Sequence, residues 1–69
     1  MSEQTARSMT PADILRSALR KEEAAYRFYA SMLEMTRVDE VRALLARLRD
    51  EEAKHVQLVK RQIVALNLG

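Results

Sequence analysis

Cysteine and tryptophan are absent from this sequence, and its 69 residues include only one glycine and one proline. Without cysteine, the chain can form no disulfide bond, thiolate zinc site or iron–sulfur cluster. Because tight turns draw on glycine and proline, a fold of many short strands is not expected. Alanine, leucine, arginine and glutamate dominate the remaining composition, and these residues favour helices.

Long apolar segments are also missing. No run approaches the ~20 apolar residues that a membrane-spanning helix needs, and residues 1–10 lack the apolar core of a signal peptide. The formal net charge is only +2, and the twelve Lys and Arg residues alternate with ten Asp and Glu residues. Because neither a membrane span nor a signal peptide is found, we expect a cytoplasmic protein that does not bind membranes. Because the charges form no basic patch, we expect no binding of nucleic acid.

The hydropathy pattern predicts an all-α chain with a flexible N-terminal tail over residues 1–9 and an antiparallel two-helix hairpin over residues 10–69. The break between the helices is short, as in hairpins with loops of about 2–5 residues. A hairpin is a single layer that must bury its apolar face against something. Small chains without disulfides use a metal or a partner subunit for this. Both remain open for this chain, and two helices of nearly equal length are as expected for half of a four-helix bundle, so we expect the hairpin to dimerise into one.

The first helix should begin at Thr10, which can cap it, with Pro11 at the first helical position, and should continue to about Met35. At about 100° per residue, its apolar residues form one stripe: Leu15, Ala18, Leu19, Ala25, Tyr26, Tyr29 and Leu33. Glu22 lies in the middle of this stripe, where an apolar residue would be expected.

The second helix should run from about Glu40 to about Leu66. Thr36 or Asp39 can cap its beginning, and the Asn and Gly residues within 67–69 should end it. Its apolar stripe has these members: Val41, Leu44, Leu45, Leu48, Val59, Ile63 and Leu66. The stripe contains a polar gap between Leu48 and Val59.

Glu52 and His55 fill that gap, three residues apart and on one face. Glu22 lies about fifteen residues before the centre of the turn and Glu52 about fifteen after it, so an antiparallel hairpin brings the two level. A carboxylate on a core face is costly unless it is paired or binds a metal, and no Lys or Arg lies centrally on either stripe. One Glu plus Glu-x-x-His is half the ligand set of a di-iron carboxylate site. We therefore interpret all three residues as metal ligands.

Each of these residues also has a simpler interpretation. His55 alone is typical of a hydrogen-bonded core histidine, and a lone buried Glu can be protonated or paired with Arg. Three such residues at one level favour the metal. Tyr26 and Tyr29 are core aromatic residues whose hydroxyls can donate hydrogen bonds to ligating carboxylates. Glu23 and Glu51 flank the site and should be solvated, with a role in metal entry as the alternative.

Two segments resemble the rubrerythrin branch of the ferritin-like superfamily. Residues 19–29 (LRKEEAAYRFY) place Glu22 seven residues before the Tyr of a Phe-Tyr pair, and residues 48–55 (LRDEEAKH) are an acidic run that ends in Glu-x-x-His. The similarity covers roughly residues 15–63. This sequence differs from typical rubrerythrins, which carry both halves of the bundle in one chain and also have the Cys pairs of a rubredoxin domain.

The architecture is similar to that of encapsulated ferritins, two-helix proteins that build a ferroxidase centre between subunits. This resemblance implies that the hairpin is half a ferritin-like bundle, and that it forms a homodimer or a higher homo-oligomer. It also implies an encapsulin shell as a partner and an encapsulin compartment as a location. Encapsulated ferritins usually carry a further C-terminal helix and a targeting tail, neither of which is in this sequence.

Our hypothesis from the sequence is a di-iron carboxylate protein that oxidises Fe(II) with O₂ or peroxide at Glu22, Glu52 and His55, with the site completed across a homodimer. Carboxylate oxygens with one imidazole suit iron, with Mn or Zn as alternative occupants. The alternatives are a metal-free helical dimerisation module, a rubrerythrin-like peroxidase that uses an external electron donor, and a small regulator whose basic face binds nucleic acid.

Overall fold

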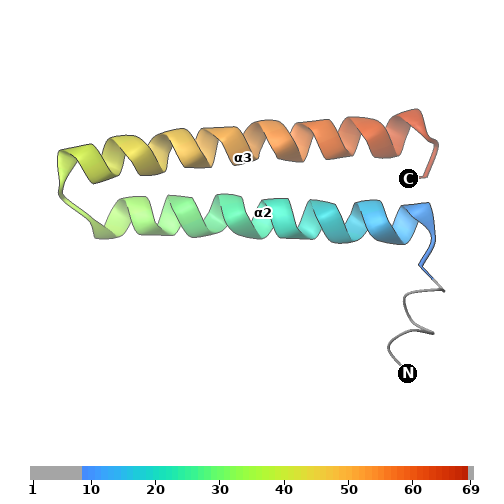
Figure 1. The fold of residues 1–69 in the computed structure, drawn as a ribbon, viewed down its shortest axis with the longest axis horizontal. Coiled ribbons are helices and arrows are strands. Elements are labelled where there is room, and N and C mark those ends of the chain that lie inside the picture. The colour runs from blue at the N-terminus through green and yellow to red at the C-terminus, as the bar shows by residue number, and fades with distance from the viewer. Residues whose placement is uncertain (1–8, 69) are drawn as a thin grey trace, which may run out of the picture.

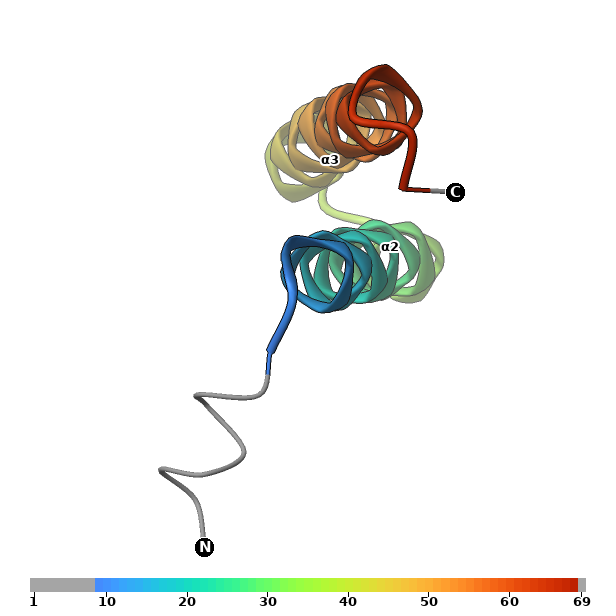
Figure 2. The same ribbon diagram turned by 90° about the vertical axis from the view of Figure 1, so that its right-hand side faces the viewer.

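The computed structural model describes residues 9–68 and shows two antiparallel helices that lie side by side (Figures 1 and 2). Helix α2 spans Pro11–Met35 with 25 residues, and helix α3 spans Asp39–Ala65 with 27 residues. No strand occurs within residues 9–68. The predicted all-α hairpin is therefore confirmed. The tail predicted for residues 1–9 falls, except for Met9, outside the described residues, as does Gly69.

Helix α2 begins with a reciprocal cap. The Asp13 backbone N–H donates to Oγ1 of Thr10 at 3.1 Å, and the Thr10 backbone N–H donates to Oδ2 of Asp13, also at 3.1 Å. Pro11 occupies the first turn, where its missing N–H leaves no helical hydrogen bond unmade. The predicted start and end of this helix agree with the structure.

The connection between the helices differs from the prediction in its cap. Val38 is the residue that precedes α3, and no side chain caps this helix. Asp39 already lies in the first turn, where its charge favours the positive end of the helix dipole. Thr36 instead accepts a hydrogen bond from the Val38 N–H at 3.2 Å, which shapes the turn. The prediction that Thr36 or Asp39 caps α3 was therefore wrong.

The side chain of Arg42, in the first turns of α3, forms hydrogen bonds with the backbone of the same turn. Its guanidinium donates to the backbone carbonyls of Leu33 and Thr36 at the end of α2. The last turn of α2 has no basic residue of its own. Arg42 therefore satisfies carbonyls that a helix leaves free at its C-terminus.

Asn67 ends α3 in the left-handed conformation, with φ of 57°. The Leu68 N–H donates to the Ile63 carbonyl and the Asn67 N–H to the Val64 carbonyl, each at 2.9 Å, which is a Schellman motif. The predicted role of Asn67 as a C-terminal cap is confirmed. Arg16 on α2 donates to the Leu68 carbonyl at 3.0 Å, so the open end of the hairpin is also tied.

The seam between the helices is half-buried, and no side chain within residues 9–68 is fully buried. The half-buried members of the two predicted stripes are Leu15, Ala18, Leu19, Ala25, Tyr29, Leu33, Leu45, Leu48, Val59 and Ile63. Tyr26, Val41, Leu44 and Leu66 belong to the same stripes but are exposed. The apolar surface is therefore wider than one partner helix can cover.

Candidate metal centre

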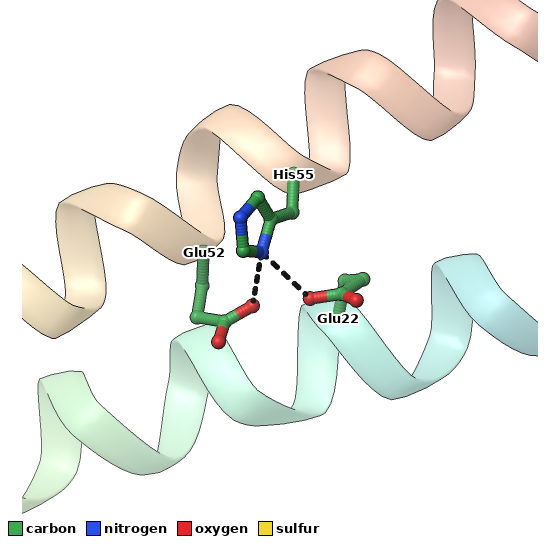
Figure 3. A group of neighbouring side chains, drawn as sticks. All are labelled: Glu22, Glu52 and His55. Carbon is green, nitrogen blue, oxygen red and sulfur yellow. Dashed lines mark hydrogen bonds and ion pairs between the residues drawn. The ribbon is translucent and has the colours of Figure 1, made fainter.

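Glu22, Glu52 and His55 come together at the middle of the seam (Figure 3). Glu22 projects from α2, and Glu52 and His55 project from α3 toward it. One ligand atom from each residue lies within 4.8 Å of the others. From their equal distances to the turn, we predicted that Glu22 and Glu52 lie at the same height along the hairpin, and the structure brings the two side chains together there.

The Nδ1 atom of His55 lies between the two carboxylates. It is 3.4 Å from Oε1 of Glu22 and 3.3 Å from Oε1 of Glu52. A ring nitrogen carries at most one proton, so Nδ1 can donate to only one carboxylate at a time. The site therefore has more acceptor oxygens than protein protons to satisfy them.

The three side chains differ in exposure. The exposed fraction is 18% for Glu52, 31% for Glu22 and 48% for His55. The carboxylates thus lie within the seam, and the imidazole lies toward one of its open sides. A site of this kind remains accessible to a second protein chain or to solvent on the side of His55.

Mutual contacts shift the pKa values of all three groups. Hydrogen bonding between the two carboxyl groups lowers the pKa of Glu22 and raises the pKa of Glu52, so Glu22 loses its proton more readily than Glu52 does. Hydrogen bonding to Glu52, and then to Glu22, raises the pKa of His55 against the opposing effect of desolvation. The two acids therefore need a proton or another cation beside them.

No lysine or arginine within residues 9–68 forms an ion pair with Glu22 or Glu52. The donor set suits a metal ion, because two carboxylate oxygens and one imidazole nitrogen are common ligands of Fe, Mn and Zn. Two atoms bound to one metal at about 2.1 Å lie at most about 4.2 Å apart. Small side-chain rotations would bring the three atoms to such distances.

Comparison with known proteins supports the same chemistry. A family profile described as Rubrerythrin matches residues 9–69, nearly the whole chain. The chain belongs to the rubrerythrin family. No curated protein and no solved structure matches it. The family predicted from residues 19–29 and 48–55 is therefore confirmed, while the finer likeness to encapsulated ferritins stays a prediction.

Tyr26 and Tyr29, the two tyrosines predicted to donate hydrogen bonds to ligating carboxylates, differ in exposure in this rubrerythrin-family hairpin. Tyr29 is half-buried and packs edge-on against Phe28, with ring centroids 5.5 Å apart and planes at 71°. Tyr26 is exposed on the flank of the hairpin. Within residues 9–68, neither hydroxyl forms a hydrogen bond with Glu22, Glu52 or His55, so the role predicted for the two tyrosines stays a prediction.

Beside the centre lies a groove that we did not predict from the sequence. Its volume is about 360 Å³. It is lined by Glu23, Tyr26, Arg27, Ala53, Val56 and Gln57, and we call it the flank groove. The sequence signal for it is that Glu23, Ala53 and Val56 each directly follow one of the three candidate ligands.

No helix within residues 9–68 is both long and apolar enough to cross a membrane.

Proposed function

We propose that this rubrerythrin-family chain is a di-iron carboxylate protein that oxidises Fe(II) with O₂ or peroxide. Glu22, Glu52 and His55 would hold the iron, and a bound di-iron pair would supply the redox chemistry. The observation that carries the proposal is the convergence of these three ligand atoms within 4.8 Å at the middle of the seam. In the reaction with O₂, two substrate Fe(II) ions would each give up one electron, and O₂ would take up these electrons and two protons to become hydrogen peroxide. In the reaction with peroxide, the O–O bond would break, and two electrons and two protons would give two water molecules.

One hairpin supplies too few ligands for such a site. Di-iron sites in helical bundles take a Glu from each of two helices and Glu-x-x-His from each of the other two. The hairpin supplies one Glu on α2 and one Glu-x-x-His on α3. A second copy related by two-fold symmetry would supply the other half. We therefore propose that the functional unit is a homodimer.

Exposed apolar residues on the same side of the hairpin as His55 support this dimer. Ile14, Phe28, Leu44 and Leu58 are each more than half exposed. Exposed apolar patches of this kind mark sites of association. Together with His55 these residues form what we call the open face.

Helical periodicity places all five residues on one side of the hairpin. At about 100° per residue, Leu44, His55 and Leu58 lie within about 60° of one another on α3, and Ile14 and Phe28 lie within about 40° on α2. On both helices these residues are rotated away from Glu52 or Glu22 in the same sense. For facing antiparallel helices, the same sense of rotation leads to the same side.

The test is to load purified protein with Fe(II) under anaerobic conditions and then admit air. We expect iron to be retained on a dimer and to be oxidised faster than in a protein-free blank. Light scattering would give the molar mass and mass spectrometry the metal content per chain. Oxidation at the rate of the blank would refute the function. A dimer that retains no iron would support the metal-free dimerisation module, which the open face favours equally.

Higher homo-oligomers, an encapsulin shell, and a cytoplasmic or encapsulated location stay predictions from the sequence and its resemblance. A peroxidase that uses an external electron donor would share the same three ligands. Steady turnover of peroxide on addition of a reduced donor protein would favour it over the ferroxidase.

A further inference from the structure

The flank groove runs alongside the candidate centre. Glu23, Ala53 and Val56 line it, and each is the next residue after Glu22, Glu52 or His55. One residue further along a helix turns the side chain by about 100°. On facing antiparallel helices this turn brings all three to the same side of the seam, opposite the open face. The groove and the open face thus flank the centre on its two sides.

The groove has room for a small molecule, and its lining carries no net formal charge. Its volume of about 360 Å³ is about twelve times the roughly 30 Å³ that one water occupies in the liquid. The lining carries one carboxylate, Glu23, and one guanidinium, Arg27, so its formal charges cancel. Neither a cation nor an anion is attracted as a result. Ala53, the residue that directly follows Glu52, has the smallest side chain in the lining.

We propose that the flank groove is the route by which a small uncharged oxidant, dioxygen or hydrogen peroxide, reaches the metals. This inference rests on the proposed function. In the proposed dimer the second copy covers the open face, and the flank groove is the side that stays in contact with solvent. Ala53 sets the width of the route, and the groove residues form no bond with the oxidant.

The experiment narrows the groove in the full-length protein with Ala53→Leu. Ala43→Leu is the matched control, because Ala43 is an exposed alanine on the outer side of the same helix, about 180° from Glu52. A second variant, Gln57→Trp, fills the groove from an exposed position. It tests the same route if Ala53→Leu fails to fold.

Each variant is first loaded with Fe(II) anaerobically to equal metal content. Nitric oxide, a small uncharged probe, is then mixed in, and its binding is followed by absorbance in a stopped-flow instrument. In separate runs O₂ and hydrogen peroxide replace it. We expect Ala53→Leu and Gln57→Trp to slow nitric oxide binding and oxidation several-fold, while metal content, loading rate and dimer mass match the parent and Ala43→Leu.

Three results would overturn the inference. Equal nitric oxide rates in Ala53→Leu, Gln57→Trp and Ala43→Leu would show that the groove is not the route. Slower anaerobic loading with unchanged nitric oxide binding would make it the route of the cation. Loss of the dimer in both groove variants would make this flank a subunit interface. A parent protein that takes up no iron would instead refute the proposed function, and the inference with it.

Discussion

The Nδ1 atom of His55 lies 3.4 Å from Oε1 of Glu22, although the two residues are 33 positions apart. Within residues 9–68, hydrogen bonds between side chains of α2 and α3 occur only among Glu22, Glu52 and His55. The other long-range side-chain bonds run from Arg16 to the Leu68 carbonyl and from Arg42 to the Leu33 and Thr36 carbonyls, near the two ends of the hairpin. The centre is thus the polar link between the helices at the middle of the hairpin. The presence and the protonation of its three side chains should therefore govern both metal uptake and stability.

Removal of a predicted ligand should abolish metal loading without unfolding the protein. We expect this of Glu52→Ala and His55→Ala, because each loses one of the few donor atoms that lie within 4.8 Å. Glu51→Ala is the control, since Glu51 is exposed and its carboxylate pairs at 3.9 Å with Lys54. Metal content per chain by mass spectrometry, with helicity by circular dichroism, would check this. An equal loss of metal in Glu51→Ala and Glu52→Ala would mean that the ligand assignment is wrong.

The metal-free protein should lose stability as the pH rises above 6.5. The pKa of His55 is raised from 6.5, mainly by hydrogen bonding to Glu52, so the folded state binds this proton more tightly than the unfolded state does. The stabilisation is complete below 6.5 and is lost as the pH rises through the raised pKa. Thermal unfolding in the presence of a chelator would measure it. His55→Ala should lack this decline, and an identical decline in that variant would contradict the assignment.

Metal binding should depend on pH in the opposite direction and weaken as the pH falls. A metal ligates the neutral imidazole, so protons compete with it. Because the pKa of His55 is raised, this competition should begin at a higher pH than for an ordinary histidine. Metal affinity, measured by titration calorimetry, should therefore weaken as the pH falls through that raised pKa.

Charged substitutions on the open face should prevent dimer formation. Leu58→Lys places a charge where the proposed partner would pack, and its metal content should fall along with its molar mass. Val64→Lys is the control, because Val64 is 76% exposed but lies on the flank away from His55. Light scattering would measure the mass. A dimer that survives Leu58→Lys but not Val64→Lys would move the interface to the other side of the hairpin.

Loss of the Arg42 side chain should destabilise the turn. Its hydrogen bonds to the carbonyls of Leu33 and Thr36 would be replaced by water, which we expect to lower the free energy of unfolding by about 1 kcal/mol in Arg42→Ala. Arg47→Ala is the control, since Arg47 is exposed on the same helix and makes no such bond within residues 9–68. Urea unfolding of both variants would compare them. Equal stabilities would show that the turn does not depend on Arg42.

Local sequence patterns sufficed for the helices and for the position of the centre. The Thr10 cap and the Asn67 end depend on neighbouring residues alone. The contact between Glu22 and Glu52 depends only on equal distances from one short turn. These features could be predicted because the rise per residue and the hairpin geometry are fixed.

Other features depend on how the two helices are rotated against each other. Periodicity predicts that Leu44 and Leu66 belong to an apolar stripe, but not how much of that stripe one partner helix covers. The Arg42 bonds depend on the conformation of the turn, and the lining of the flank groove draws on both helices. Neither is encoded within a single helix, so neither was predicted.

A hairpin without any fully buried side chain in residues 9–68 cannot draw much stability from its own interior. If a second copy provides the missing contacts, folding and association become one equilibrium, and the temperature of unfolding depends on protein concentration. Tenfold dilution of the metal-free protein should then lower its thermal midpoint, and one that stays constant would mean that the lone hairpin folds unaided. The amount of this chain present would thereby set the threshold at which iron chemistry becomes available at all.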